Sequence, residues 1–394
     1  MEPSEVAQDV HILVVAGEAS GDQHAASLVS ELRAARPSLR FFGMGGGRLA
    51  QEGVELLYDA HEISVMGFTE VLPKIPRILK VLGGLVEAAK VRRPALAILV
   101  DVPDFNLRLA RKLKAMGVPV AYYVSPMLWA WRPGRVKQFA RDVDRMLCIL
   151  PFEEDWYRQR GVSAKYGGSP VLDHLPPALT AGSHRRALGL DPERPTLALL
   201  PGSRMAEVRK LLPSMVDAAR TLALKRPGLQ VVVPVAPSIP REEVEARFEN
   251  TGLRPLFVDG RAPEAVGASD VSIVASGTAT LEAGLMQRPL VVVYRVSALS
   301  WLIGRMLVKV AFVSLVNLLV GRRVVPELLQ DQMQPAKIVG EVERLWEGAG
   351  RAEAEAGLQE LRAKLGEPGA AKRAAEAVLE LLDQKAACAM PAAR

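Results

Sequence analysis

The chain alternates short, almost uninterrupted apolar runs with longer segments of helical period, and this alternation most restricts its fold. The runs are rich in Val, Ile and Leu, the composition that a strand buried on both faces needs. Segments of helical pattern between them, at residues 25–36, 106–115 and 208–225, supply the crossovers that parallel strands require. The pattern therefore predicts an α/β fold with doubly wound parallel sheets. The expected strands cover residues 12–16, 39–43, 96–100, 118–124, 146–150, 196–200, 229–235, 256–258, 271–275 and 290–294.

The alternation of expected strands and helices is interrupted between residues 167 and 195, a stretch that contains five prolines. A chain of 394 residues corresponds to two or three domains, so we interpret this stretch as a linker. The expected domains are 9–172 and 190–345, both Rossmann-like. Helices are expected at 346–394, docking on the first domain or on another subunit. Two such domains in tandem predict a ligand cleft between them.

Composition excludes several classes of protein. Two cysteines, Cys148 and Cys388, are too few for a disulfide framework, and the five histidines do not stand at zinc-ligand spacing. No apolar stretch is long enough to predict a membrane-spanning helix, and the N-terminus lacks the pattern of a signal peptide. We therefore expect a cytoplasmic protein. The net charge of +6 is compatible with an anionic partner, but the dispersed basic residues argue against nucleic acid.

The first expected strand runs into the turn 17–22 (GEASGD), after which a helix begins. Glycines permit a tight turn, and a helix N-terminus presents free N–H groups to an anion. Ser20, Gly21 and Asp22 are candidate ligand contacts, although Ser20 or Asp22 would equally serve as helix caps. Glu18 is the stronger candidate and a candidate catalytic residue, because it lies inside the turn, where capping does not explain it. The glycines at 43–47 do not form a dinucleotide-binding fingerprint.

Asp101 follows the expected strand 96–100, at the edge where active sites of this architecture lie. Partial burial there would raise its pKa and suit a general base, and the alternative is a carboxylate that bonds loop amides. Asp104 is better explained as a helix cap. Asn106 is the last residue of the same motif and is a candidate acceptor or loop residue. Trp129 belongs to an aromatic run, 122–131, that would line a cleft or fill a core.

Two loops of the second half have the composition of phosphate sites. Ser203 and Arg204 follow the strand 196–200 in a loop of small residues, where backbone amides and a guanidinium can hold a phosphate. The segment 276–282 follows another strand and opens a helix, and its hydroxyls suit a pyrophosphate, with Glu282 positioned for a ribose. The hydroxyl and glycine candidates are Ser276, Gly277, Thr278 and Thr280.

An apolar segment bordered by basic residues lies at 64–93. A core helix is the ordinary explanation, but the same pattern describes a helix that lies on an anionic membrane. The candidate membrane or acyl-chain contacts are Val65, Met66, Phe68, Val71, Leu72, Ile78 and Leu82.

Seven collinear segments resemble the lipid-A-disaccharide synthase family of glycosyltransferases. Together they extend over residues ~11 to ~330 in the family order, which makes the resemblance far more specific than any single motif. The segments are 15–22 (VAGEASGD), 64–72 (SVMGFTEVL), 101–106 (DVPDFN), 123–135 (YVSPMLWAWRPGR), 199–204 (LLPGSR), 275–282 (ASGTATLE) and 317–330 (NLLVGRRVVPELLQ).

The resemblance implies a GT-B-type, inverting glycosyltransferase of lipid A biosynthesis. Its substrates would be UDP-2,3-diacylglucosamine and 2,3-diacylglucosamine 1-phosphate, and its products a β-1,6-linked tetraacyl disaccharide 1-phosphate and UDP. Asp101 matches the base, Arg204 the phosphate loop and Asn317 the nucleotide-side loop. No metal or other cofactor is implied. The expected location is peripheral, on the cytoplasmic face of the inner membrane, and an oligomer is compatible with the sequence.

Three positions depart from the family pattern. Ser169 stands where a histidine is usual, Val316 replaces a proline and Met127 a glutamine. Two rival functions remain open at this stage. One is a UDP-N-acetylglucosamine 2-epimerase, which shares the two-domain architecture, and the other is a non-catalytic membrane-associated binding module.

Overall fold

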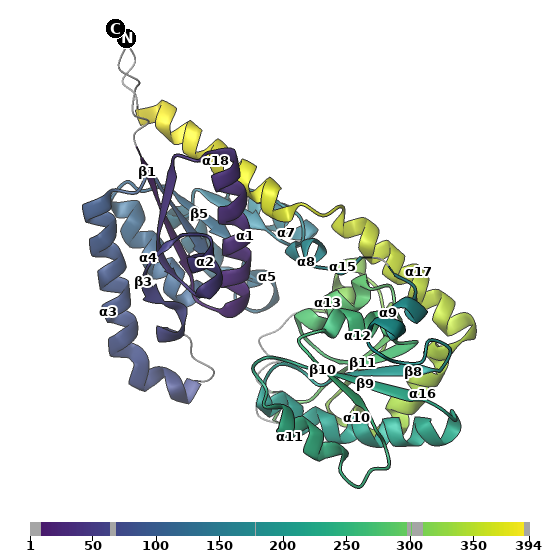
Figure 1. The fold of residues 1–394 in the computed structure, drawn as a ribbon. Helices are drawn as coiled ribbons and strands as arrows, with labels where there is room; N and C mark the ends of the chain where they lie inside the picture. Colours follow the sequence, from purple (N-terminus) through teal and green to yellow (C-terminus); the bar gives the residue numbers. More distant parts are fainter. Residues whose placement is uncertain (1–8, 64–67, 178, 298–300, 302–309, 390–394) are drawn as a thin grey trace, which may run out of the picture. The chain divides into compact units, whose positions relative to one another are not determined.

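The computed structural model describes residues 9–63, 68–177, 179–297, 301 and 310–389. The chain forms two compact units (Figure 1). Unit 1 comprises Met1–Asp173 together with Glu367–Arg394, and unit 2 comprises His174–Gly366. Each unit is built on one parallel sheet flanked by helices, so the predicted tandem of Rossmann-like halves is confirmed. The cleft expected between the halves stays a prediction.

The sheet of unit 1 has seven strands in the order β3-β2-β1-β4-β5-β6-β7. All neighbouring pairs are parallel. The chain builds outward from β1 in one direction and then crosses back to place β4 on the other side of β1. The strands are β1 (Val10–Ala16), β2 (Leu39–Gly45), β3 (Glu55–Asp59), β4 (Leu96–Val100), β5 (Val120–Tyr123), β6 (Arg145–Cys148) and β7 (Ala164–Tyr166).

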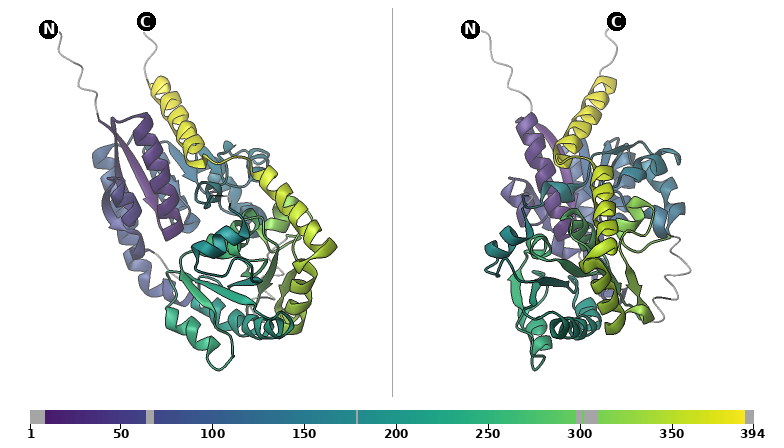
Figure 2. Two further views of the ribbon diagram at one scale, coloured as in Figure 1. Left: turned by 45° about the vertical axis from the view of Figure 1, so that its right-hand side comes forward. Right: turned by 90° about the vertical axis from the view of Figure 1, so that its right-hand side faces the viewer.

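Helices cover both faces of this sheet. The crossover helices α3 and α4 lie on one face, whereas α1 and the C-terminal α18 lie side by side on the other, as two views show (Figures 1 and 2). The helices of unit 1 are α1 (Ala19–Ala35), α2 (Gly47–Gln51), α3 (Phe68–Arg92), α4 (Pro103–Ala115), α5 (Leu128–Trp131), α6 (Val136–Asp142), α7 (Pro151–Arg158), α8 (Pro170–Asp173) and α18 (Ala370–Ala389).

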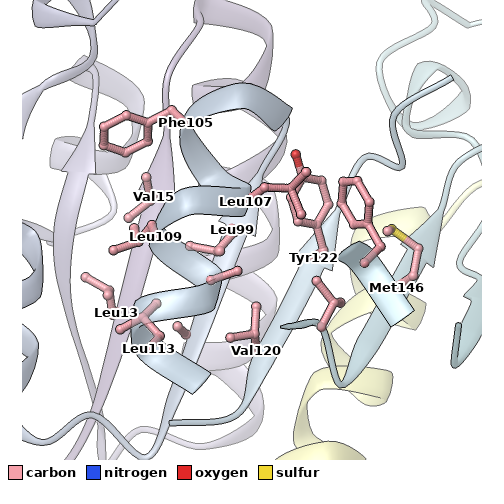
Figure 3. Close-up of a cluster of buried hydrophobic side chains, with 14 of the residues drawn as sticks. Leu13, Val15, Leu99, Phe105, Leu107, Leu109, Leu113, Val120, Tyr122 and Met146 are labelled. Carbon is pink, nitrogen blue, oxygen red and sulfur yellow. The ribbon is translucent and has the colours of Figure 1, made fainter. Parts of the chain in front are cut away.

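The side chains of β1 alternate between two hydrophobic cores. Leu13 and Val15 join the core beneath α4, together with Leu99 and Leu109 (Figure 3). Val14, on the opposite face, joins the core that α1 and α18 cover. Because successive strand residues point to opposite faces, a strand covered on both sides must be apolar at nearly every position. The continuous apolar runs of the sequence arise from this requirement.

Unit 2 repeats the architecture with six parallel strands in the order β10-β9-β8-β11-β12-β13. The helices α10 and α16 pack on one face, and α12 and α13 contact the strands from the other (Figure 1). The strands are β8 (Thr196–Leu200), β9 (Gln230–Val235), β10 (Leu256–Asp259), β11 (Val271–Ala275), β12 (Leu290–Tyr294) and β13 (Glu327–Leu329). The helices are α9 (Ala181–Ala187), α10 (Met205–Lys225), α11 (Arg241–Glu245), α12 (Ala262–Ala268), α13 (Thr278–Leu285), α15 (Leu315–Val320), α16 (Pro335–Trp346) and α17 (Gly348–Leu365).

The C-terminal helices divide between the units. The helix α17 belongs to unit 2, whereas α18 belongs to unit 1. Small and apolar residues of α18, including Ala374 and Val378, are buried against unit 1. The guanidinium of Arg373 also donates to the carbonyl oxygen of Gly167 at 2.8 Å. The end of the chain therefore completes the first sheet's cover of helices.

Candidate active site

Each sheet reverses its strand order at one point, and the predicted site residues follow the strands that meet there. The reversal lies between β1 and β4 in unit 1 and between β8 and β11 in unit 2. Loops at the carboxyl ends of two such strands run in opposite directions and leave room for a ligand. In unit 1 these loops carry Glu18 and Asp101, and in unit 2 they carry Arg204 and Ser276.

Asp101 lies in a strained turn directly after β4. Its φ is 53° and that of Val102 is 42°, in the left-handed region that a β-branched valine rarely adopts. Buried Asn106 holds the turn, because its Nδ2 donates to the carbonyl oxygens of Val100 at 3.1 Å and Asp101 at 2.7 Å. The hydroxyl of Tyr122 donates to the carbonyl oxygen of Asp101 as well. These contacts engage the backbone of residue 101, so its conformation does not depend on the carboxylate.

The surroundings of Asp101 raise the pKa of its carboxyl group. Burial raises its pKa to about 6, with the negative charge of Glu18 as the second cause, while the backbone N–H of Val102 acts in the opposite direction. Glu18 is the exposed residue before α1 and makes no capping hydrogen bond with its side chain. A carboxylate whose pKa lies near the working pH is suited to accept a proton during a reaction.

Two other predicted contacts lie in the first turn of α1. Ser20 is exposed to solvent. Gly21 lies close to the candidate base, since a Cβ added to it would be 3.8 Å from the Cβ of Asp101. Gly21 therefore borders the turn that carries Asp101.

Asp22 and Asn106 have structural roles. The buried carboxylate of Asp22 accepts hydrogen bonds from the backbone N–H groups of Gly46 at 2.7 Å and Arg48 at 3.0 Å, at the start of α2. Asn106 is fully buried beneath the Asp101 turn. Each side chain is covered and holds a neighbouring loop, and their contact with the acceptor stays a prediction.

Glu153 is a buried carboxylate that no sequence motif indicates. It lies in the first turn of α7, is 0% exposed, and accepts hydrogen bonds from the Ser125 hydroxyl, Nε1 of Trp129 at 3.0 Å and the Leu150 N–H at 3.1 Å. Burial raises its pKa to about 7, although these donors oppose the shift. Ser125 and Trp129 flank the loop after β5, next to the Asp101 turn after β4. Glu153 therefore fixes that loop, and Trp129 is half-buried against it.

We expect Glu153→Ala to lower the free energy of unfolding by about 2–4 kcal/mol, because three buried donors lose their acceptor. Urea unfolding followed by tryptophan fluorescence measures the change. Asp155→Ala is the matched control, since that carboxylate is exposed on the same helix. A Glu153→Ala protein as stable as Asp155→Ala would show that the hydrogen bonds contribute nothing net.

In unit 2, the loop after β8 turns sharply at Gly202. Its φ is 109°, and a Cβ there would lie 2.7 Å from Oε2 of Glu207. Ser203 and Arg204 follow and are exposed. The carbonyl oxygen of Ser203 accepts a hydrogen bond from Ser238 at 2.7 Å, which anchors the loop. The Arg204 side chain is 69% exposed and pairs with Glu207 at 3.0 Å.

The neighbouring loop after β11 opens α13. Gly277, with φ of 152°, precedes the helix and is exposed together with Thr278, while Ser276 is half-buried. Thr280 is fully buried, and its hydroxyl donates to the carbonyl oxygen of Gly277 at 2.8 Å, so its contact with a pyrophosphate stays a prediction. Burial raises the pKa of Glu282.

The two loops of unit 2 are in contact at their bases. A Cβ on Gly202 would lie 3.5 Å from the Cβ of Ala275. The two adjacent loops therefore offer a guanidinium, exposed hydroxyls and the N–H groups at the start of α13. Groups of these kinds bind phosphate oxygens. Within the described ranges, no cluster of three His, Cys, Asp or Glu side chains is placed to hold a metal ion.

Asn317 is buried and holds a loop. Its Oδ1 accepts from the N–H groups of Val324 at 2.7 Å and Val325 at 2.9 Å, and its Nδ2 donates to Glu327 at 2.8 Å. The residue is 0% exposed, as is Val316 beside it. The nucleotide contact of Asn317 stays a prediction, and in this structure its amide is engaged within the fold.

The helix α3 presents a different apolar face from the predicted one. Leu82 is 6% exposed and belongs to the core of unit 1, and half-buried Ile78 packs against that core, so their contact with a membrane or acyl chain stays a prediction. Among the described side chains of α3, the large exposed apolar ones are Ile75 at 39%, Leu79 at 51% and Val91 at 76%. Val65 and Met66 lie outside the described residues, and Phe68, Val71 and Leu72 belong to the first turns of α3. In the part of the chain described, no helix combines the length and apolar character needed to span a bilayer.

Solved structures of sugar-nucleotide enzymes have the same fold. The UDP-GlcNAc 2-epimerase of Neisseria meningitidis, solved with UDP-GlcNAc, matches 95% of this chain and 100% of its own with a TM-score of 0.63 and 12% identity. MurG of Acinetobacter baumannii matches 95% and 99%, with a TM-score of 0.59 and 14% identity. The calicheamicin glycosyltransferase CalG4 matches 98% and 100%, with a TM-score of 0.63 and 15% identity. At such identities the likeness shows the fold, and the predicted GT-B architecture is confirmed.

Sequence relatives are much closer. The sequence model of the family described as lipid-A-disaccharide synthetase matches residues 12–381. The lipid-A-disaccharide synthase of Myxococcus xanthus is 68% identical over 372 residues, which are 94% of this chain and 97% of that protein. The lipid-A-disaccharide synthase of Syntrophus aciditrophicus is 45% identical over 375 residues, with the same coverage. The chain therefore belongs to the lipid-A-disaccharide synthase family of glycosyltransferases.

Proposed function

We propose that this protein transfers 2,3-diacylglucosamine from its UDP derivative to 2,3-diacylglucosamine 1-phosphate. The acceptor's 6-hydroxyl oxygen forms a bond to C1 of the donor sugar on the face opposite UDP. The bond between C1 and the diphosphate oxygen breaks, and its electron pair leaves with UDP. The hydroxyl proton passes to a protein base. The products are a β-1,6-linked tetraacyl disaccharide 1-phosphate and UDP.

Asp101 is the proposed base, and its turn is the single observation that carries the mechanism. The carboxylate lies at the strand-order reversal of unit 1 with its pKa raised to about 6 by burial and by Glu18. At neutral pH it is mostly ionised and can accept the acceptor's proton. Burial in a poorly solvated turn strengthens its interaction with that proton as the carbon–oxygen bond forms.

Unit 2 is the proposed donor-binding unit. Arg204, Ser203 and the start of α13 offer a charged donor, hydroxyls and backbone N–H groups to a diphosphate. Negative charge on that diphosphate grows as the bond to C1 breaks, so these groups bind the transition state more strongly than the ground state. Glu282, partly buried one turn into the helix, is the proposed ribose contact.

An assay of UDP release tests this function. Purified protein is incubated with both diacylglucosamine substrates, UDP is measured with a coupled enzyme, and the lipid product is identified by its mass. We expect equal amounts of UDP and tetraacyl disaccharide. If neither product forms with a folded protein, the proposed function is wrong.

The same assay separates the rival functions, which the sequence relatives do not favour. An epimerase would convert a UDP-sugar into an isomer of unchanged mass. A binding module would retain both substrates unaltered. A new disaccharide excludes both alternatives.

The substrates carry acyl chains, so we propose that α3 lies on the cytoplasmic face of the inner membrane. Its exposed Ile75 and Leu79 would enter the headgroup region, while Arg77 and Lys80 on the same turns face anionic lipids. This arrangement keeps the protein peripheral and brings unit 1 to the lipid substrates.

We expect Ile75→Ser with Leu79→Ser to weaken binding to vesicles containing phosphatidylglycerol by about 10-fold or more, because two apolar side chains are no longer buried on binding. Vesicle co-sedimentation measures the affinity. Leu224→Ser is the control, since that leucine is 87% exposed in unit 2. Equal binding by both variants would contradict the membrane role of α3.

A further inference from the structure

A groove of about 270 Å³ lies between α4 and α6 of unit 1. Leu107 forms part of its lining, and the rest is mainly charged. The four arginines outnumber the two aspartates, which gives the groove two excess positive charges. Its charged lining residues are Asp104, Arg108, Arg111, Arg135, Arg141 and Asp142.

The two aspartates are already paired. Asp104 binds Arg135 at 2.8 Å, and Asp142 binds Arg141 at 2.6 Å. Both aspartates belong to the helices that form the groove's sides. Their negative charges therefore do not balance the remaining arginines.

Arg108 and Arg111 are the unbalanced pair. Both are exposed, and neither has an ion pair or hydrogen bond with another described residue. They stand three positions apart on α4, so they share one helical face, where like charges repel. They also precede the last turn of the helix, so the negative end of the helix dipole does not account for them. An anion between these guanidinium groups would remove the repulsion.

The groove begins near the proposed base. Asp104 lies three residues after Asp101, in the first turn of α4. Arg108 follows Asp104 by about 6 Å along the helix axis, and Arg111 by about 10 Å. The end of the groove at Asp104 is therefore close to Asp101 along the chain, and the two arginines follow along α4.

We propose that this groove binds the phosphate monoester of the acceptor sugar through Arg108 and Arg111. The inference rests on the proposed function, which supplies an acceptor with one phosphate. Guanidinium groups bind phosphate oxygens through paired, charge-assisted hydrogen bonds. Arg135, oriented by Asp104, closes the end of the groove nearest Asp101. The site would select the phosphorylated acceptor and fix its orientation toward the base.

The test compares two acceptors, 2,3-diacylglucosamine 1-phosphate and 2,3-diacylglucosamine without phosphate. We expect the wild-type protein to prefer the phosphorylated acceptor in kcat/KM. Arg108→Gln with Arg111→Gln should reduce this preference by about 10- to 100-fold. It should leave kcat/KM for the unphosphorylated acceptor and KM for the UDP-sugar unchanged. Lys112→Gln is the matched control, because Lys112 is exposed on the same helix and does not line the groove.

Three outcomes overturn the inference. The first is a double variant that keeps the wild-type preference. The second is a wild-type protein that uses both acceptors equally well, which leaves the glycosyltransferase function intact. The third is a double variant that binds phosphatidylglycerol vesicles less tightly but keeps its preference, which would assign the arginines to lipid headgroups. If neither acceptor gives a disaccharide, the proposed function fails and the inference fails with it.

Discussion

Replacing Asp101 with Asn is expected to lower turnover by about 10²- to 10⁴-fold, the usual contribution of a general base. The amide has nearly the same shape as the carboxylate but cannot accept the acceptor's proton at neutral pH. Unit 1 should fold normally, because Asn106 and Tyr122 hydrogen-bond to the carbonyl oxygen of residue 101, which the substitution preserves. UDP release measures turnover, and circular dichroism checks the fold. Asp155→Asn, an exposed carboxylate in unit 1, is the control.

The pH profile distinguishes a base from a residue that merely shapes the site. Activity needs the ionised carboxylate, so it should fall as the pH decreases through about 6, the pKa of Asp101. Glu18 raises that pKa by its negative charge, so Glu18→Gln should move the acidic limb to lower pH. A limb at the same pH in both proteins would contradict the role of Asp101, as would wild-type turnover by Asp101→Asn.

The sequence patterns predict the interior strands of both sheets and one edge strand, β10, and miss the other three edge strands. Central strands such as β4, β8, β11 and β12 have the predicted bounds, because burial on both faces makes each one an uninterrupted apolar run. The missed strands are β3, β7 and β13, and each lies at an edge of its sheet. These edge strands are partly exposed, so Glu55 or Lys165 occurs where an interior strand would be apolar. Their place in the sheet depends on the neighbouring strand, which local sequence does not specify.

The same distinction applies to the site. Sequence reasoning places Asp101, Arg204 and the start of α13 correctly at the carboxyl edges of the sheets, because each directly follows a recognisable strand. It assigns Asp22 and Asn317 to ligands, although both bind backbone groups, some of them distant in sequence. A polar residue in a loop can serve either purpose, and the choice depends on which chain segments meet it in three dimensions.

Glu153 is the opposite kind of error, a residue that holds the site's loop and that the sequence patterns do not identify. Its partners Ser125 and Trp129 lie 28 and 24 residues earlier in the chain, so no motif around Glu153 reveals them. The remaining local signal is weak: an acidic residue in the first turn of a helix is usually a cap. The tertiary fold places the segment after β5 against α7, and in that position the Glu153 carboxylate holds the loop beside Asp101.

Replacing Arg204 with Ala is expected to lower kcat by about 10²- to 10³-fold, because the guanidinium would stabilise charge that develops on the departing diphosphate. The fold should not change. The Arg204 side chain is 69% exposed, and its ion pair with Glu207 is a surface pair that contributes little to stability. Since the lost interaction belongs mainly to the transition state, kcat should fall more than KM for the UDP-sugar rises.

Two further variants make the test of Arg204 specific. Arg204→Lys keeps the positive charge without the planar fork that binds two phosphate oxygens, so it should recover only part of the lost activity. Arg209→Ala is the matched control, because this arginine lies in the helix α10 that Arg204 precedes and pairs with Glu243 at 3.4 Å on the surface. A rise in KM with an unchanged kcat would assign Arg204 to ground-state binding. Wild-type kinetics in Arg204→Ala would exclude the loop after β8 as the diphosphate site, since no other guanidinium is proposed there.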